Sequence, residues 1–242
     1  MLRKLYSQAG QDHWVIRDVL NFKRNGFFLD IGAADGVTYS NSYALEKYFG
    51  WKGVCIEGDA KTYQVLKGNR TATCVNACID STSREAVFTT EKGLYGGIVE
   101  SDTDNKALVE GKERGVVVTT QKLEDVLRQH QAPAVIDYLS LDIEGAEERA
   151  LRDFPFDQWT FLCATIERPT LVLKEVLARN NYHLVAEQPE LDAFYIHETI
   201  SGKYLRRFLE RAERQNLSAS QKMVAALQGV MKRGLRASLD RI

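Results

Sequence analysis

Acidic residues stand at the ends of several apolar segments of this chain. Asp30 lies in FFLDI, Glu57 ends VCIE, Asp142 follows VIDYLSL and Glu167 ends FLCATIE. Carboxylates in such places can accept hydrogen bonds from ribose hydroxyls, orient or deprotonate a substrate hydroxyl, or bind a hard cation. If the apolar segments are parallel strands, their carboxyl ends meet at one edge of a sheet. The sequence therefore predicts one ligand site that is lined by carboxylates.

The loop after Asp30 favours a ligand with a positive charge. Its spacing, Asp30-x-Gly32-x-Ala34-x-Gly36, departs from the G-x-G-x-x-G of dinucleotide sites, and the carboxylates of Asp30 and Asp35 would repel a pyrophosphate. S-adenosylmethionine carries an ammonium group and a sulfonium centre, which the same carboxylates would attract. A nicotinamide-dependent oxidoreductase is the weaker rival. Small residues would let the backbone approach the cofactor closely, and the loop contains Gly32, Ala33, Ala34 and Gly36.

Glu57 ends the second apolar segment, in the sequence CIEGD. An acidic residue at about this distance from the first strand holds a ribose diol in nucleoside-binding sheets, since one carboxylate can accept from both hydroxyls. Nicotinamide enzymes use the same contact, so Glu57 by itself supports a nucleoside ligand of either kind. Gly58 and Asp59 follow it and are also candidates for cofactor binding.

Strands that alternate with helices are the elements that would position these residues. The nearly continuous Val, Ile, Leu and Phe of several segments favours a mostly parallel α/β sheet that is covered on both faces. We expect helices that begin at Tyr43 and that include residues 63–68, 123–128, 144–154 and 171–180. Strands are expected over residues 27–31, 53–59, 71–79, 85–90, 116–120, 135–143 and 161–167, with a closing hairpin over 182–187 and 193–197.

The bulk composition favours one domain with appendages. Of the 242 residues, 44% are hydrophobic, which suits one well-formed core, and the net charge of -1 argues against binding nucleic acid through bulk charge. The four cysteines form no Cys-x-x-Cys pair and are expected to be buried thiols in a reducing cytosol. Without a signal-like start or an apolar run of ~20 residues, we expect a cytoplasmic location and no transmembrane segment.

Three parts of the chain stand apart from the alternating pattern. Residues 92–115 indicate an inserted surface loop, in which Tyr95 lies between glycines and could act as a lid or stack on a sugar. Residues 201–242 carry ten basic and three acidic residues, with apolar residues at helical spacing. This tail could pack on the domain, form a homo-oligomer, or meet an anionic membrane or a nucleotide-linked sugar. The remainder, residues 1–200, forms the predicted domain.

Several segments together resemble the FkbM family of S-adenosylmethionine-dependent methyltransferases. They are YSQAGQD (6–12), the long run from Gly26 to Asp59, VIDYLSLDIEGAE (135–147) and TIERP (165–169). The resemblance spans residues 6–197 and implies a Rossmann-like seven-stranded sheet with S-adenosylmethionine as cofactor. It implies a cofactor loop at Asp30, Gly32, Ala34 and Gly36, with Glu57 on the ribose. The family commonly has Glu-Pro where this chain has Glu57-Gly58.

The resemblance also implies that an N-terminal segment, residues 1–25, folds over the cofactor crevice and contributes Gln8 and Asp12. Ser42, with Tyr39 and Asn41 beside it, follows the cofactor loop and offers neutral groups to cofactor or substrate. The alternative for these residues is a helix start with Ser40 or Asn41 as its cap.

The chemistry of methyl transfer points to Asp142. It is expected at the end of a buried strand, with Glu144 and Glu147 on the first turn of the following helix. Asp142 could deprotonate a substrate hydroxyl, because the protein must align the nucleophile and remove its proton. Alternatively Asp142, Glu144 and Glu167 could bind Mg²⁺, which would lower the hydroxyl pKa. Among the histidines, His183 is the alternative base, and His13, His130 and His197 are weaker candidates.

These observations predict an S-adenosylmethionine-dependent O-methyltransferase that acts on a hydroxyl of a sugar or glycan precursor. Methylation of a non-sugar secondary metabolite is an alternative. A catalytically inactive nucleoside-binding module in polysaccharide assembly is another. In each case the expected partner is a small molecule and not a nucleic acid.

Overall fold

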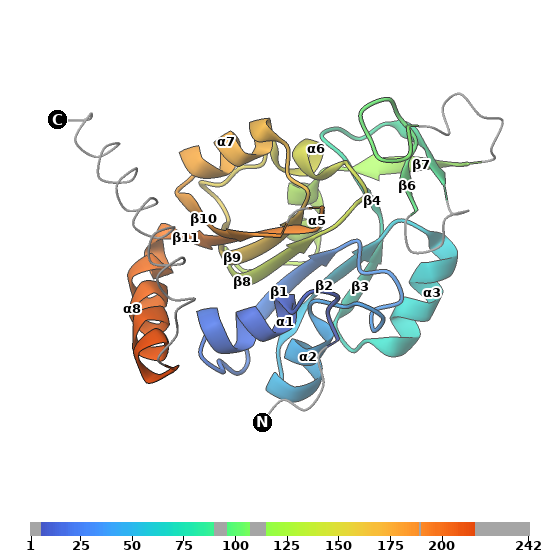
Figure 1. Cartoon of the computed structure of the whole chain (residues 1–242). Helices are drawn as coiled ribbons and strands as arrows, with labels where there is room; N and C mark the ends of the chain where they lie inside the picture. The colour runs from blue at the N-terminus through green and yellow to red at the C-terminus, as the bar shows by residue number, and fades with distance from the viewer. Residues whose placement is uncertain (1–5, 90–95, 107–114, 189, 216–242) are drawn as a thin grey trace.

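The computed structural model describes residues 6–89, 96–106, 115–188 and 190–215 (Figure 1). Tyr95 and residues 216–242 of the predicted tail lie outside these ranges.

Seven strands form the main sheet, in the order β10-β11-β9-β8-β1-β2-β3. Neighbouring strands are parallel except that β11 runs antiparallel to both β9 and β10. The predicted α/β class, with a mostly parallel Rossmann-like sheet and a closing hairpin, is confirmed. The strands are β1 (Phe27–Ile31), β2 (Lys52–Glu57), β3 (Thr73–Asn76), β8 (Val135–Leu141), β9 (Thr160–Glu167), β10 (Tyr182–Glu187) and β11 (Asp192–His197).

Helices cover both faces of the main sheet (Figure 1). Successive side chains of a strand point to opposite faces, so β1 sends Phe28 into one buried cluster and Leu29 and Ile31 into the other. One face carries η1, α2 and α3, and the other carries α5, α6 and α7. The helices are α1 (Gln11–His13), the π-helix η1 (Trp14–Val19), α2 (Tyr43–Phe49), α3 (Ala60–Asn69), α5 (Leu123–Gln129), α6 (Glu147–Leu151), α7 (Leu171–Arg179) and α8 (Glu198–Gln215).

A second, smaller sheet has the order β4-β7-β5-β6, and its strands are β4 (Cys78–Ile79), β7 (Val116–Gln121), β5 (Glu85–Thr89) and β6 (Gly97–Ile98). The prediction of one strand over residues 71–79 is therefore wrong, because Ala77 separates β3 in the main sheet from β4 in the smaller one. At this point the Asn76 amide donates to the carbonyls of Glu57 and Gly58, at 2.8 and 3.1 Å. These bonds end the pairing with β2, and the chain crosses to the second sheet.

The helix expected over residues 144–154 begins later, at Glu147, and ends at Leu151. Glu144 and Gly145 have left-handed backbone conformations, with φ of 55° and 96°, so they form a turn and not the first helical turn. Glu147 caps this turn, because its Oε1 accepts hydrogen bonds from the N–H of Ile143 at 2.8 Å and of Gly145 at 3.3 Å. The prediction that Glu144 lies on the helix is therefore wrong.

The segment predicted as a surface loop, residues 92–115, is packed in its described part. β6 pairs with β5, and Thr103 and Asn105 are only 2% and 1% exposed. The N–H of Asp104 donates to the Glu144 carbonyl at 3.0 Å. This segment therefore contributes strand β6 to the smaller sheet and supports the turn after β8.

The two ends of the described chain pack on the main sheet. Gln11 donates from Nε2 to the Asp192 carboxylate at 2.7 Å, and Ser7 forms an isolated bridge with Tyr39. The described part of the predicted tail is helical, as α8, and Tyr204 is 2% exposed within it. Among the described residues, no helix has the length and apolar character to cross a membrane.

Candidate functional site

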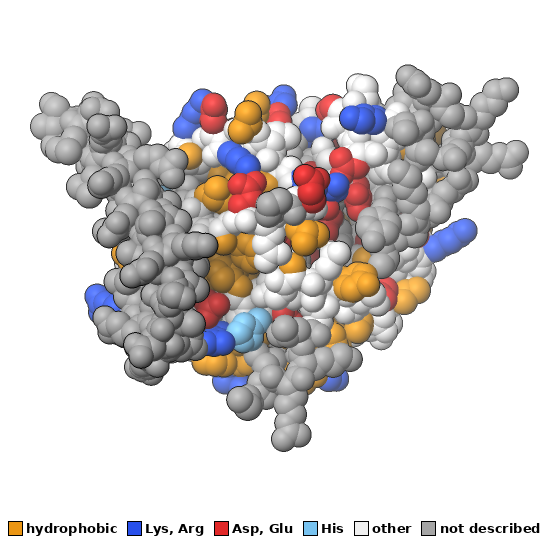
Figure 2. Space-filling model, in the orientation of Figure 1, with side chains coloured by type: hydrophobic (Ala, Val, Ile, Leu, Met, Phe, Trp, Pro, Cys, Tyr) orange, Lys and Arg blue, Asp and Glu red, His pale blue; other side chains and the backbone are white. Residues whose placement is uncertain are grey.

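A cavity of about 290 Å³ opens at the carboxyl ends of β1, β2, β8 and β9. Figure 2 shows acidic side chains gathered around a hollow on the face that it draws. Most of the residues predicted from sequence line this cavity: Gln8, Asp30, Gly32, Ala33, Ala34, Glu57, Gly58, Asp59, Asp142, Glu144 and Glu167.

Four predicted site residues are not among those that line the cavity: Asp12, Gly36, Ser42 and His183. Asp12 is buried, and its carboxylate accepts hydrogen bonds from the Tyr6 N–H at 3.0 Å and the Ser7 hydroxyl at 2.6 Å. It thus shapes the N-terminal segment, from which Gln8 reaches the cavity. His183 lies on β10, and the other three histidines are also absent from the lining.

The glycines of the loop after β1 are required by the fold of the chain itself. Gly32 has a φ of +82°, and a Cβ there would lie 1.7 Å from the Asp142 carbonyl oxygen. Gly36, at a φ of +80°, would place a Cβ 2.6 Å from Leu66 and 2.7 Å from Arg70. The loop after β1 therefore passes in backbone contact with the end of β8. Sequence reasoning assigned the small residues to close approach of the cofactor, whereas at these two positions they make room for neighbouring protein.

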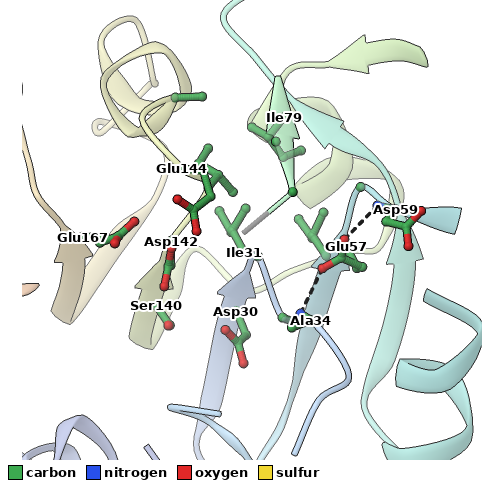
Figure 3. Close-up of a pocket in the computed structure, with 18 of the residues that line it drawn as sticks. Asp30, Ile31, Ala34, Glu57, Asp59, Ile79, Ser140, Asp142, Glu144 and Glu167 are labelled. Carbon is green, nitrogen blue, oxygen red and sulfur yellow. Dashed lines mark hydrogen bonds between the residues drawn. The ribbon is translucent and has the colours of Figure 1, made fainter. Parts of the chain in front are cut away.

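Glu57 is held by the backbone at the end of β2. Its two carboxylate oxygens accept hydrogen bonds from the Ala34 N–H at 2.9 Å and the Asp59 N–H at 2.7 Å (Figure 3). Burial raises the pKa of Glu57, and these bonds oppose the rise. Each oxygen keeps a second lone pair, so Glu57 can still accept from a diol. Asp59 has a further task, because it caps α3 by accepting from the Thr62 N–H at 2.9 Å.

Asp30 rests on a buried cation that sequence reasoning missed. Asp30 is 3% exposed, accepts a hydrogen bond from Ser42 and lies 3.9 Å from Arg70, whose side chain is fully buried. Burial raises the pKa of Asp30, and the charge of Arg70 opposes this. Arg70 also pairs with Glu46 at 2.6 Å and donates to the Gly36 carbonyl at 3.1 Å. The charge of Asp30 is therefore largely balanced by the protein and serves to anchor the loop.

The smaller sheet supplies an apolar wall that the sequence did not reveal. Ile79, Phe88 and Ile98 line the cavity from β4, β5 and β6. A Cβ on Gly58 would lie 2.7 Å from the Phe88 ring, which explains why the turn after Glu57 holds a glycine. The sequence did not predict this wall, because the strands that form it are short and distant in sequence from the main motifs.

Three carboxyl groups face one another at the end of the cavity that is formed by β8 and β9. Figure 3 shows Asp142, Glu144 and Glu167 directed toward the same space from β9 and from the end of β8 and its following turn. Burial raises the pKa of Asp142 well above its ordinary value, and the negative charge of Glu167 and a hydrogen bond with it add to the rise. Asp142 therefore holds a proton more readily than an exposed carboxyl does. Burial and the charge of Glu167 also raise the pKa of Glu144 to about 7.

Arg168 is the counter-ion of this acidic group. Its Nη2 lies 2.8 Å from Glu167 Oε1 and 3.4 Å from Glu144 Oε2, and it also pairs with Asp104. The other oxygen of Glu167, Oε2, is buried and accepts no hydrogen bond from any described N–H or hydroxyl. Arg168 belongs to the TIERP segment, but its contact with three carboxylates depends on the turn after β8.

Among the residues that the structure describes, two groups of three carboxylates are compact enough to hold a cation. One is Asp142, Glu147 and Glu167, and the other is Asp104, Glu144 and Glu167, each with ligand atoms within 4.8 Å of one another. The predicted set of Asp142, Glu144 and Glu167 is thus divided between them. The second group already contacts the Arg168 guanidinium, so a hard cation fits the first group better.

Strained backbone is concentrated at the cavity. Five of the ten described non-glycine residues with positive φ line it: Ala34, Tyr39, Glu144, Arg168 and Glu190. Tyr39 combines a φ of 56° with a side chain that is 56% exposed. Such conformations cost about 1 to 3 kcal/mol each and are concentrated at functional sites. This clustering supports the cavity as the site, independently of residue types.

A family model and several solved structures are similar to this chain. A family model described as the methyltransferase FkbM domain matches residues 30–200. No curated protein matches the chain. A TehB-like SAM-dependent methyltransferase from Corynebacterium glutamicum is similar at 12% identity and a TM-score of 0.44, with 79% of this chain and 89% of that chain covered.

Two further solved structures are similar at the same level. Methyltransferase FkbM from Methylobacillus flagellatus has 15% identity and a TM-score of 0.45, with 72% of this chain and 44% of that chain covered. This chain therefore spans under half of that protein. The METTL16 MTase domain has 13% identity and a TM-score of 0.47, with 81% and 68% covered.

Proposed function

Because this chain belongs to the FkbM family of S-adenosylmethionine-dependent methyltransferases, we propose that it transfers the methyl group to a hydroxyl oxygen of a sugar or glycan precursor. The observation that carries the proposal is the approach of the Asp142 and Glu167 carboxyl groups to one another, across the cavity from Glu57. A hydroxyl is a weak nucleophile until its proton is taken, and this pair is a base in the place where an acceptor would enter.

The end of the cavity at β2 suits the nucleoside part of the cofactor. The spare lone pairs of Glu57 would accept from the ribose hydroxyls, and the apolar wall of Ile79 and Phe88 would pack against the adenine ring. When bound, S-adenosylmethionine supplies an electrophilic methyl group on a sulfonium centre. Asp142, at the turn between the two ends, would face the reacting groups.

The acidic pair would act as a general base. Burial and the negative charge of Glu167 raise the pKa of Asp142, which makes its carboxylate a stronger base. This carboxylate would accept the hydroxyl proton as the oxygen takes the methyl group and the carbon–sulfur bond breaks. Arg168 would hold Glu167 in place during this step through its 2.8 Å ion pair. Gln8 and Asn41 also line the cavity and would orient the acceptor by hydrogen bonds.

The test has two parts. Calorimetry should show S-adenosylhomocysteine binding and no comparable binding of NAD. Incubation with S-adenosylmethionine and a panel of sugars, glycosides and non-sugar alcohols should then release S-adenosylhomocysteine and give an O-methylated product by mass spectrometry. Methylation of nitrogen or carbon acceptors alone would overturn the O-methyl assignment. Cofactor binding without any transfer would favour the inactive nucleoside-binding module.

A cation-assisted mechanism is the second candidate. The observation that favours it is the approach of Asp142, Glu147 and Glu167 within 4.8 Å, an all-oxygen set that suits Mg²⁺. Glu147 would contribute its second oxygen, since Oε1 accepts from two backbone N–H groups. Activity that is lost with a chelator and restored by Mg²⁺ would select this mechanism. Activity that is unchanged by the chelator would select the unaided base.

A further inference from the structure

Carboxyl groups outnumber cations among the described residues that line the cavity. Among the described residues that line it, seven carry carboxylates and one carries a cation, Arg168. The carboxylates are those of Asp30, Glu57, Asp59, Asp142, Glu144, Glu167 and Glu190. Because Arg70 balances Asp30, and because Glu57 and Asp59 lie at the β2 end, the excess at the acceptor end comes from the residues after β8 and β9.

Arg168 has little capacity to bind an anion. Its guanidinium contacts Glu167, Glu144 and Asp104. All three contacts are made by Nη2, so a phosphate or carboxylate that approached this guanidinium would lie beside three carboxylates and be repelled by them. The one described cation of the lining therefore stabilises the acidic wall and does not offer an anion site.

The unused hydrogen-bonding atoms at this end are acceptors. Glu167 Oε2 is buried and accepts from no described N–H or hydroxyl. Asn41 adds a second case: Ser140 donates its proton to Asp30, so Asn41 must donate to Ser140 through Nδ2, at 3.0 Å. Asn41 Oδ1 is then left buried and without a donor. Both atoms require a ligand that donates, and hydroxyl and ammonium groups donate whereas an ionised phosphate does not.

We infer that the methyl acceptor is an uncharged or amine-bearing polyol, with no phosphate or carboxylate near the hydroxyl that is methylated. The acidic wall and the unpartnered acceptors Glu167 Oε2 and Asn41 Oδ1 select for hydrogen-bond donors and against anions. Nucleotide-linked and phosphorylated sugars are thereby excluded in favour of free, glycosidic or amino sugars. This inference rests on the proposed transfer to a hydroxyl and specifies its substrate class.

The experiment compares four glucose derivatives that are neutral, cationic or anionic. With S-adenosylmethionine present, release of S-adenosylhomocysteine is measured for methyl glucoside, glucosamine, glucose 6-phosphate and UDP-glucose. Binding of the same four compounds to the protein loaded with S-adenosylhomocysteine is followed by saturation-transfer NMR. We expect the neutral and amino sugars to bind at least tenfold more tightly, or to be turned over at least tenfold faster, than the anionic sugars. Glu144→Lys should narrow or reverse this ratio, since it changes the sign of one wall charge.

The matched control is Glu175→Lys, an equal charge change on the exposed surface of α7, which should leave the ratio unchanged. Preferential turnover of the anionic members would overturn the inference and leave the proposed O-methyl transfer intact. Equal shifts in the ratio for both lysine variants would also overturn it, because the effect would then come from overall charge. If the protein binds S-adenosylhomocysteine but methylates no hydroxyl compound, the proposed function is wrong and the inference is wrong with it.

Discussion

The two ends of the cavity hold carboxylates in opposite ways. At the β2 end, each oxygen of Glu57 accepts a backbone N–H, at 2.9 and 2.7 Å. At the β9 end, Arg168 holds one oxygen of Glu167, and the other accepts from no described N–H or hydroxyl. The first carboxylate is fixed before any ligand arrives, which suits a cofactor that is always the same. The second keeps an acceptor atom for a ligand that reacts.

The largest expected effect is on the free energy of unfolding. It tests whether the charged residues at the β2 end of the cavity also stabilise the fold. Arg70→Met removes the guanidinium that pairs with Glu46 and lies 3.9 Å from Asp30, and it leaves both carboxylates buried without a cation. We expect the free energy of unfolding to fall by about 3 to 5 kcal/mol. Urea titration measures this loss. Arg179→Met is the control, since its pair with Glu175 is exposed and should contribute about 0.5 kcal/mol or less.

The next prediction tests whether the β9 end of the cavity serves turnover and the β2 end serves cofactor binding. Asp142→Asn keeps the shape of the side chain and removes the carboxylate that would take the proton, so turnover should fall by roughly 100-fold or more. Binding of S-adenosylhomocysteine should stay within a few-fold of the parent. Single-turnover kinetics and calorimetry give the two numbers. Parent-like turnover would exclude Asp142 from the chemistry and leave Glu167 as the candidate base.

The reciprocal change is made at the other end. Glu57→Ala removes the acceptor for the ribose and for the N–H groups of Ala34 and Asp59. Affinity for S-adenosylhomocysteine should fall by about 1.5 to 3 kcal/mol, which is roughly 10- to 150-fold in Kd. Turnover at saturating cofactor should change less than in Asp142→Asn. An unchanged Kd would mean that Glu57 serves only the loop.

The smallest expected effect concerns pH and stability at the acidic end. Burial raises the pKa of Glu147 from 4.5 to about 7, so between these values the folded protein binds more protons than the unfolded chain. Its contribution to stability therefore falls as the pH rises through this window. Glu147→Gln keeps an acceptor for Ile143 and has no charge. Relative to the parent, the variant should gain about 1 to 2 kcal/mol between about pH 5 and pH 8 in urea titrations, and a constant difference would contradict the raised pKa.

The sequence predicted the main sheet well because its signal is local. Most strands of the main sheet carry their own apolar run, and the acidic residues at their carboxyl ends, such as Glu57 and Asp142, fall at one edge by the geometry of parallel strands. Residues 71–79 were predicted wrongly because one apolar run serves two sheets, and only the Asn76 side chain marks the division. A short polar bond of this kind leaves no periodic pattern in the sequence.

The charges that tune the site were harder to predict. Arg70 follows α3 in an ordinary polar stretch, and its role depends on meeting Asp30 from another element. Arg168 was within a recognised segment, but its pairing with Asp104 and Glu144 depends on two turns that sequence periodicity does not define. The start of α6 was missed for a related reason: Glu144 takes a left-handed conformation that is uncommon for a non-glycine residue.

If the cavity wall were mutated so that the enzyme accepts new alcohols, Gly32 could not be among the substituted residues. The smallest added side-chain atom at Gly32 would lie 1.7 Å from the Asp142 carbonyl oxygen, and the φ of +82° disfavours every other residue. Because that carbonyl adjoins the side chain that would take the proton, a bulkier residue would displace the reactive carboxyl together with the loop. A saturation library at this codon should return glycine alone among active clones.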